Sequence, residues 1–233
     1  MNIQESLGWL ATTSPEASEL FNEIVQTNVY QLSESIVSGR PILDIGANIG
    51  VFSILASTLG ASNIIAVEPV SQTFSNLERN LLQAGVGSRV KSLKVAVMSK
   101  PGMVRIGLQE KSGHNSLYGQ SKNYESVYAV TLSDLIRQLG GDNIFLKMDC
   151  EGAEYDILLG TPHEEMAKVS RIAIEIHSDV HPSYKGFDLI WNRLKEFGFS
   201  LVDRQPLFAW DVDSLGHKVN YRPLPLTGEI WNR

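Results

Sequence analysis

Two glycines, Gly46 and Gly50, stand between a strand-like apolar run and a helical apolar run, in the segment LDIGANIG at residues 43–50. Glycine lets the backbone turn sharply and lets a ligand approach it closely. A helix that begins directly after this turn would point its free N–H groups and its positive dipole end at such a ligand. Asp44 could accept a hydrogen bond from a ligand amine or orient the turn, and Asn48 offers a donor and an acceptor. The pattern predicts a ligand-binding strand-to-helix turn.

Glu68 follows the next apolar run and lies 22 residues after Gly46. A carboxylate in this place can accept hydrogen bonds from both ribose hydroxyls of a nucleoside. Dinucleotide dehydrogenases use the same device, but their fingerprint is Gly-x-Gly-x-x-Gly and this chain has Gly-x-x-x-Gly. The missing third glycine favours a nucleoside without a pyrophosphate. A nicotinamide-dependent oxidoreductase and a non-catalytic binding module on the same fold remain alternatives.

Two further strand-like runs end in groups that could move a proton, Asp149 and His177. A histidine beside a carboxylate is a candidate general base, since its ordinary pKa is about 6.5. Asp149 and Glu151 could orient a substrate or hold Mg²⁺ against its oxygen, but the cluster lacks a defined ligand pattern and we predict no metal site. Glu154 would supply favourable charge in the first turn of a helix. Glu175 would share the strand face of His177, as a partner for Lys147 on the adjacent strand or as part of the site floor.

The elements that must position these groups alternate along the chain. Apolar runs predict strands at 42–45, 63–68, 89–97, 144–149, 169–177 and 199–202, and helical spacing predicts helices at 49–59, from 71, 131–139, 153–159 and 187–197. This alternation indicates an α/β, doubly wound, mostly parallel sheet with helices on both faces. A hairpin at 103–108 and 126–131, with a polar loop at 109–125, interrupts it.

The first 40 residues predict a helical cap on a single domain at 41–233. Ser14 and Pro15 suit the start of a helix, and apolar residues from Phe21 to Ile36 continue at helical spacing. The first 39 residues contain five acids and neither Lys nor Arg. This acidic cap is a candidate surface for a homodimer.

The chain has 233 residues, a net charge of −6 and one cysteine, Cys150. One cysteine excludes a disulfide framework or a cysteine-rich zinc site and is typical of a reducing compartment. No run approaches the roughly 20 apolar residues of a membrane helix, and the cap lacks the basic residues of a targeting signal. The acidic balance disfavours nucleic acid. We therefore expect a cytoplasmic protein with neither a membrane nor a nucleic-acid partner.

Five segments together, LDIGANIG, AVEP, KVAV, LKMDCEGAE and IEIH, resemble the FkbM family of methyltransferases over about residues 40–200. The resemblance implies a class I, Rossmann-like methyltransferase fold with a seven-stranded sheet and one antiparallel strand. It also implies bound S-adenosyl-L-methionine, S-adenosyl-L-homocysteine as product, and usually O-methylation. Family acceptors are often hydroxyls of sugars or natural products.

The resemblance also assigns roles to the motif residues. The turn at 44–50 would surround the methionine part of the cofactor, Glu68 would hold the ribose, Ala96 and Val97 would lie near the adenine, and Asp149 would lie beside the methyl group. The predicted catalytic residues are Asp149, His177 and Glu151. The predicted cofactor-binding residues are Asp44, Gly46, Ala47, Asn48, Gly50, Phe52, Glu68, Pro69, Ala96, Val97, Ser116 and Asp149. Contacts to the acceptor are expected from the loop 109–125, the segment after His177, the cap and the C-terminal segment.

Overall fold

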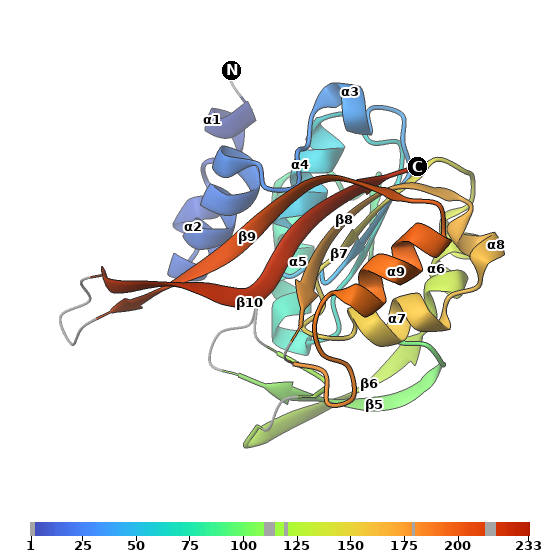
Figure 1. Cartoon of the computed structure of the whole chain (residues 1–233). Helices are drawn as coiled ribbons and strands as arrows, with labels where there is room; N and C mark the ends of the chain where they lie inside the picture. The colour runs from blue at the N-terminus through green and yellow to red at the C-terminus, as the bar shows by residue number, and fades with distance from the viewer. Residues whose placement is uncertain (1–2, 110–114, 119–120, 179, 213–217) are drawn as a thin grey trace.

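A computed structural model of the chain describes residues 3–109, 115–118, 121–178, 180–212 and 218–233. Its main sheet has seven strands (Figure 1). In spatial order they are β3 (Val90–Leu93), β2 (Ile64–Val67), β1 (Ile42–Ile45), β7 (Ile144–Met148), β8 (Val169–His177), β10 (Lys218–Asn232) and β9 (Ser200–Val212). β10 runs antiparallel to both of its neighbours, β8 and β9, and the other four pairings of this sheet are parallel. The predicted fold, with one reversed strand, is confirmed.

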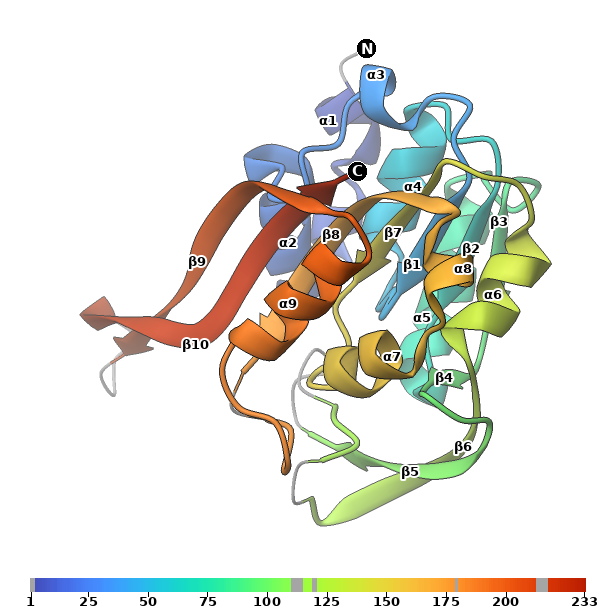
Figure 2. The same ribbon diagram turned by 45° about the vertical axis from the view of Figure 1, so that its right-hand side comes forward.

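Helices cover both faces of the sheet (Figure 2). One face packs against α4 (Val51–Thr58), α5 (Ser71–Gln83) and the N-terminal segment. The other packs against α6 (Leu132–Leu139), α7 (Glu154–Gly160) and α9 (Asp188–Glu196), near the short helix α8 (His163–Met166). Buried side chains of successive strand residues alternate between these two cores, as the twofold period of a strand requires. The parallel strands therefore all end at one edge of the sheet, where ligands bind in folds of this type.

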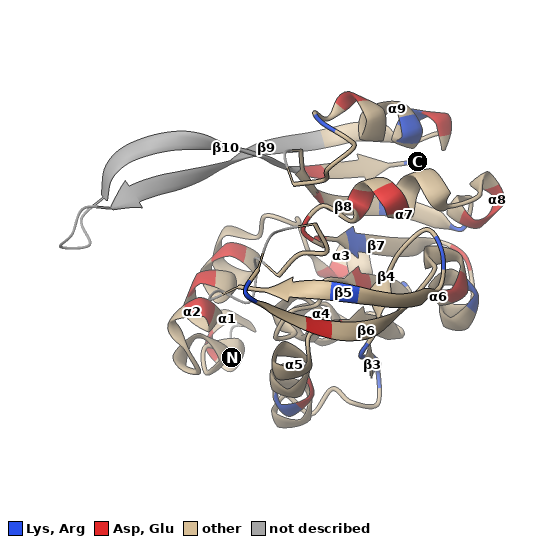
Figure 3. Ribbon diagram, turned by 90° about the horizontal axis from the view of Figure 1, so that it is seen from below, with Lys and Arg blue, Asp and Glu red and all other residues tan. Residues whose placement is uncertain are grey.

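The predicted strand at 89–97 is wrong in one respect, because it is two strands. Residues 90–93 form β3 in the main sheet, whereas β4 (Ala96–Val97) joins a second sheet with β6 (Asn123–Val130) and β5 (Gly102–Leu108). The predicted hairpin is the antiparallel pair β5 and β6. Viewed from below, this small sheet lies across the edge where the main strands end (Figure 3). Ala96 and Val97 thus face the edge from a separate strand.

The N-terminal segment contains α1 (Ile3–Leu7), a 3₁₀ turn at Leu10–Thr12, α2 (Pro15–Phe21), the π-helical turn η2 (Asn22–Thr27) and α3 (Glu34–Val37). Ser14 caps α2, as predicted, since its side chain accepts a hydrogen bond from Ala17 N at 3.0 Å. The predicted helical continuation to Ile36 is wrong. Asn28 adopts a left-handed conformation with φ 56°, and its side chain bonds both the N–H and the carbonyl of Leu32. These bonds replace helical ones and end the helix.

Residues of this N-terminal cap belong to the same buried cluster as α4 and α5, so the cap completes one face of the sheet. The domain boundary at residue 40 stays a prediction. In the described ranges, no helix has both the length and the apolar character that crossing a membrane would require.

Candidate active site

A pocket with about 650 Å³ of empty space lies where β1, β2 and β7 end, between the two sheets. Eight of the predicted site residues line it: Gly46, Asn48, Glu68, Pro69, Ala96, Val97, Asp149 and Glu151. Apolar side chains from both sheets, among them Val67, Val95 and Ile106, form the rest of its wall. The pocket is therefore built from the segments that carry the sequence motifs.

Gly46 ends β1 directly against the backbone of β7. A Cβ atom on Gly46 would lie 1.7 Å from the carbonyl oxygen of Asp149, and its φ of +74° is one that residues with a Cβ rarely adopt. Asn48, the next residue but one, also has a positive φ, at 49°. The turn is thus strained for any side chain at 46, and the missing Cβ is what lets the two strand ends meet.

We expect Gly46→Ala to lower the free energy of unfolding by about 2–4 kcal/mol, because it adds backbone strain and a clash with the chain of β7. Urea unfolding followed by circular dichroism would measure the loss. Gly39→Ala is the matched control, since Gly39 has a similar φ of +70° but open space around its missing Cβ. It should cost only about 1–2 kcal/mol. Equal losses in the two variants would contradict a clash at Gly46.

Several predicted cofactor residues lie outside this pocket. The missing Cβ of Gly50 faces Leu77 of α5, at 2.6 Å from its Cδ1 atom, so Gly50 allows two helices to pack. The ring of Phe52 is buried between the rings of Tyr30 and Phe145. Ala47 and Phe52 line a smaller hollow on the other side of the turn.

Glu68 is fixed at the mouth of the main pocket by two backbone groups. Its Oε2 accepts from Asn48 N at 3.1 Å and its Oε1 accepts from Val70 N at 3.0 Å. Each carboxylate oxygen retains a lone pair for a further donor. Burial raises the pKa of Glu68 to about 7, although both backbone bonds and the charge of Lys147 oppose this rise. The residue is thus positioned to accept hydrogen bonds from a vicinal diol.

Lys147, which the sequence suggested only as a partner for Glu175, is buried and holds the ends of β1 and β7 together. Its Nζ donates to the carbonyl of Gly46 at 2.7 Å and lies 3.5 Å from Asp44 Oδ1 and 3.6 Å from Asp149 Oδ2. Asp44 is fully buried and also accepts from Ser53 Oγ at 2.7 Å. Asp44 therefore orients the turn, the second of its two predicted roles. Burial alone would lower the pKa of Lys147, but Asp44 and Asp149 outweigh it and keep the amine protonated.

His177 is buried at the end of β8 and is held by Glu154. The Nδ1 atom of His177 lies 3.0 Å from Glu154 Oε1. Glu154 is itself fully buried and accepts from the backbone N–H groups of Cys150 and Gly152. Burial raises the pKa of Glu154, but His177 and these donors outweigh it, so the carboxylate stays ionised. Glu154 also stands in the first turn of α7, as predicted, and in addition it orients the histidine.

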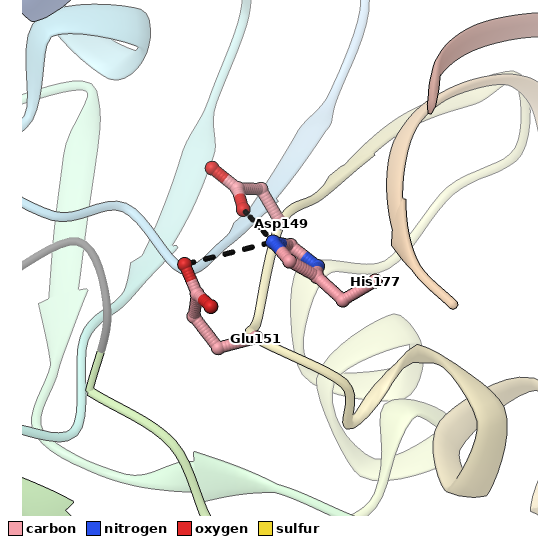
Figure 4. A group of neighbouring side chains, drawn as sticks. All are labelled: Asp149, Glu151 and His177. Carbon is pink, nitrogen blue, oxygen red and sulfur yellow. Dashed lines mark ion pairs between the residues drawn. The ribbon is translucent and has the colours of Figure 1, made fainter. Parts of the chain in front are cut away.

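The other ring nitrogen of His177 points toward the carboxylates of Asp149 and Glu151, as Figure 4 shows. His177 Nε2 lies 3.9 Å from Asp149 Oδ1, 3.5 Å from Glu151 Oε1 and 3.7 Å from Glu175 Oε1. Burial alone would lower the pKa of His177, but the surrounding carboxylates, Glu154 first, hold it well above the ordinary value. The structure thus brings the three predicted catalytic residues together.

The sequence suggested that Glu151 begins the helix α7. In the structure Glu151 lies in the turn before this helix, with φ 53°. Ser116 Oγ donates to the Glu151 carbonyl at 2.8 Å, so this predicted cofactor residue fixes the turn. The ring of His181 is tilted against Tyr118, with 4.3 Å between ring centroids, and stacks on Tyr184. Its Nδ1 accepts from the N–H groups of Ser183 and Tyr184. His181 is thus a packing residue that links two loops. Residues 110–114 and 119–120 of the predicted covering loop lie outside the described residues.

Asp149, Glu151 and His177 also form the group in the described part of the chain that best matches a metal site, with one ligand atom from each within 4.8 Å. Mg²⁺ prefers oxygen ligands, whereas this set includes an imidazole. The ammonium of Lys147, 3.6 Å from Asp149 Oδ2, offsets part of the negative charge that would attract a divalent ion. These features favour a proton-transfer site over a Mg²⁺ site.

Cys150 lines the pocket beside this group. Burial, and then the charges of Glu154 and Asp149, raise the pKa of its thiol well above the ordinary value. Since the thiolate is the nucleophilic form, Cys150 is poorly suited to attack a substrate.

Comparison with known families matches residues 44–201 to the Methyltransferase FkbM domain, a span that includes the glycine turn, Glu68, Asp149 and His177. The chain belongs to the FkbM methyltransferase family. A relative, Methyltransferase sdnD of Sordaria araneosa, is 27% identical in an alignment of 231 positions that covers 81% of this chain and 89% of that protein. The resemblance predicted from the five segments is confirmed.

The chain is also similar to a segment of a larger enzyme and to a solved methyltransferase structure. AMB antimetabolite synthetase AmbE of Pseudomonas aeruginosa is 26% identical in an alignment of 239 positions that covers 85% of this chain but only 11% of the synthetase. Precorrin-6y C5,15-methyltransferase from Geobacter metallireducens superposes with a TM-score of 0.51 and 13% identity, over 91% of this chain and 86% of that one. At this identity the superposition shows the fold alone. None of these matches supports the Mg²⁺ alternative.

Proposed function

We propose that the protein transfers a methyl group from S-adenosyl-L-methionine to a hydroxyl of a small molecule. Methyltransferases of this fold use this cofactor in general. The observation that carries the proposal is Glu68, whose two oxygens are aimed by Asn48 N and Val70 N at a pocket that also contains Asp149. This geometry suits a nucleoside whose far end reaches the end of β7.

The pocket residues fit the parts of this cofactor. Glu68 would accept from the two ribose hydroxyls, and the apolar wall that includes Ala96, Val97 and Ile106 would pack on the adenine. Asp149 lies at the opposite side of the pocket and adjoins the catalytic group. When bound, the cofactor supplies an electrophilic methyl group on a sulfonium sulfur. The protein must therefore align an acceptor oxygen with that methyl and take up the hydroxyl proton.

His177 is the base that the geometry favours. Glu154 accepts from Nδ1 and so directs Nε2 toward Asp149 and Glu151. Neutral His177 would take the hydroxyl proton at Nε2, and the ionised Glu154 would stabilise the imidazolium that results. Asp149 and Glu151 would orient the acceptor hydroxyl. The same arrangement explains why four carboxylates surround one histidine.

A natural product or sugar is the acceptor class that we propose. The protein matches a segment of an antimetabolite synthetase, whose name describes small-molecule biosynthesis. The net charge of −6 favours a small acceptor over nucleic acid. A single cysteine suits the reducing cytoplasm, where we propose that the reaction takes place.

Isothermal calorimetry would test the cofactor. We expect S-adenosyl-L-homocysteine to bind with a low-micromolar Kd, on the order of −8 kcal/mol, and NAD to bind at least about 100-fold more weakly. The titration is done in EDTA, because no residue assigned to the cofactor needs a metal. Absence of S-adenosyl-L-homocysteine binding at high micromolar concentration would rule out the proposal, and tighter NAD binding would favour an oxidoreductase. Transfer of labelled methyl to a panel of hydroxyl compounds would then identify the acceptor.

A further inference from the structure

A second hollow, with about 350 Å³ of empty space, lies between the N-terminal cap and the glycine turn. Its polar lining residues are Glu23, Tyr30, Asn48, Lys147 and Asp149. Gly46, Asn48 and Asp149 line the main pocket as well. The two spaces therefore adjoin at the glycine turn and at the end of β7.

The cap presents Glu23 to this hollow through an unusual piece of backbone. Glu23 lies in the π-helical turn Asn22–Thr27, and its carbonyl accepts from the N–H groups of Asn28 and Val29. Turns of π-helix are rare and occur often at functional sites. The left-handed Asn28 then ends the turn and lets the chain bring Tyr30 back against Phe52. Two residues of the cap thus reach the hollow from one short segment.

The charges of the hollow are unbalanced toward the negative. Glu23 and Asp149 both line it, and Asp149 shares the ammonium of Lys147 with the buried Asp44. Within the described ranges, the side chain of Glu23 makes no hydrogen bond or ion pair with another residue. Burial and then the charge of Asp149 raise the pKa of Glu23, while Lys147 lowers it. A cation that entered the hollow would relieve the repulsion between Glu23 and Asp149.

We propose that Glu23, with Asp149, binds the α-ammonium group at the amino-acid end of the cofactor, and so makes the cap part of the cofactor site. This inference rests on the proposed function. The nucleoside would occupy the main pocket, and the amino-acid end would pass Asp149 into the second hollow. The excess of carboxylate in this hollow suits a primary amine.

Glu23→Gln separates this role from other effects when two ligands are compared by calorimetry. S-adenosyl-L-homocysteine has the amino-acid end, whereas 5′-methylthioadenosine has the same nucleoside without it. We expect the variant to bind S-adenosyl-L-homocysteine about 10- to 100-fold more weakly, because a hydrogen bond to a charged group is lost. Its affinity for 5′-methylthioadenosine should stay within about twofold of the parent, which also shows that the pocket is folded.

Glu19→Gln is the matched control, since Glu19 is an exposed acid of α2 in the same cap. It should change neither affinity. Unchanged affinity of Glu23→Gln for S-adenosyl-L-homocysteine would overturn the inference, as would equal weakening of both ligands. An unchanged affinity together with a raised KM for the acceptor would place Glu23 in the acceptor site and also overturn it. Binding of S-adenosyl-L-homocysteine by the parent protein would support the proposed function whatever the result for Glu23→Gln. Absence of that binding in the parent protein would rule out the proposed function itself.

Discussion

Replacement of His177 by alanine should lower kcat by about 10²- to 10⁴-fold, the range that general base catalysis contributes. The affinity for S-adenosyl-L-homocysteine should stay within about twofold, because His177 lies on the acceptor side of Asp149 and does not line the nucleoside pocket. Single-turnover methyl transfer and calorimetry measure the two quantities. Full activity in this variant would show that another group takes the proton.

The pH dependence of the parent protein tests the same role. The pKa of His177 is held well above its ordinary value, chiefly by Glu154 once burial has been outweighed. Only neutral imidazole can accept the proton, so kcat/KM should rise with pH through that raised pKa. Glu154→Gln removes the negative charge and lowers the pKa of His177. The rise of kcat/KM should therefore occur at lower pH in this variant. If the rise of kcat/KM stays at the same pH, the titration of His177 does not control the rate.

Replacement of Glu68 by alanine should lower the affinity for S-adenosyl-L-homocysteine by about 10- to 100-fold at pH 8, because hydrogen bonds from the ribose to a charged carboxylate are lost. Calorimetry measures the affinity, and circular dichroism checks that the fold persists. Because β2 and the backbone donors Asn48 N and Val70 N remain, we expect the sheet to stay intact. Unchanged affinity would remove the ribose assignment.

The raised pKa of Glu68 gives this prediction a second measurement. Ribose hydroxyls donate best to the ionised carboxylate, and the pKa of Glu68 in the free protein is about 7. Affinity should therefore fall by up to about tenfold for each pH unit below 7 and level off above it. Glu68→Gln cannot ionise and should bind weakly at every pH. A parent profile that is flat between pH 5 and 8 would contradict the role of the ionised form.

The sequence predicted the sheet and the pocket well because their signals are local. Strand-to-helix turns, glycines and strand-end acids occur within a few residues of one another, and parallel strands must bring their ends to one edge. It predicted Asp149, Glu151 and His177 correctly as neighbours for the same reason. Their assignment to catalysis stays a prediction.

The prediction is incomplete or wrong where a contact joins distant parts of the chain. Glu154 looked like an ordinary helix-start acid, and only the position of β8 shows that it also holds His177. Lys147 looked like a partner for Glu175 alone, and only the pairing of β7 with β1 places it between two aspartates. The side-chain bonds of Asn28 that end the cap helix carry no strong sequence signal. A buried charge whose partner is remote cannot be recognised from spacing alone.

The pairing of β10 with β8 has a consequence for the order in which the protein is made. β8 lies between β7, which precedes it along the chain, and β10, whose residues 226–232 pair with residues 171–177. During synthesis, β8 and His177 emerge from the ribosome roughly 50 residues before the strand that completes them, a delay of several seconds at about 5–20 residues per second. The nucleoside pocket, built from residues 45–153, has all its chain available earlier. All residues that line the main pocket are therefore synthesised before the strand that pairs with β8 beside His177.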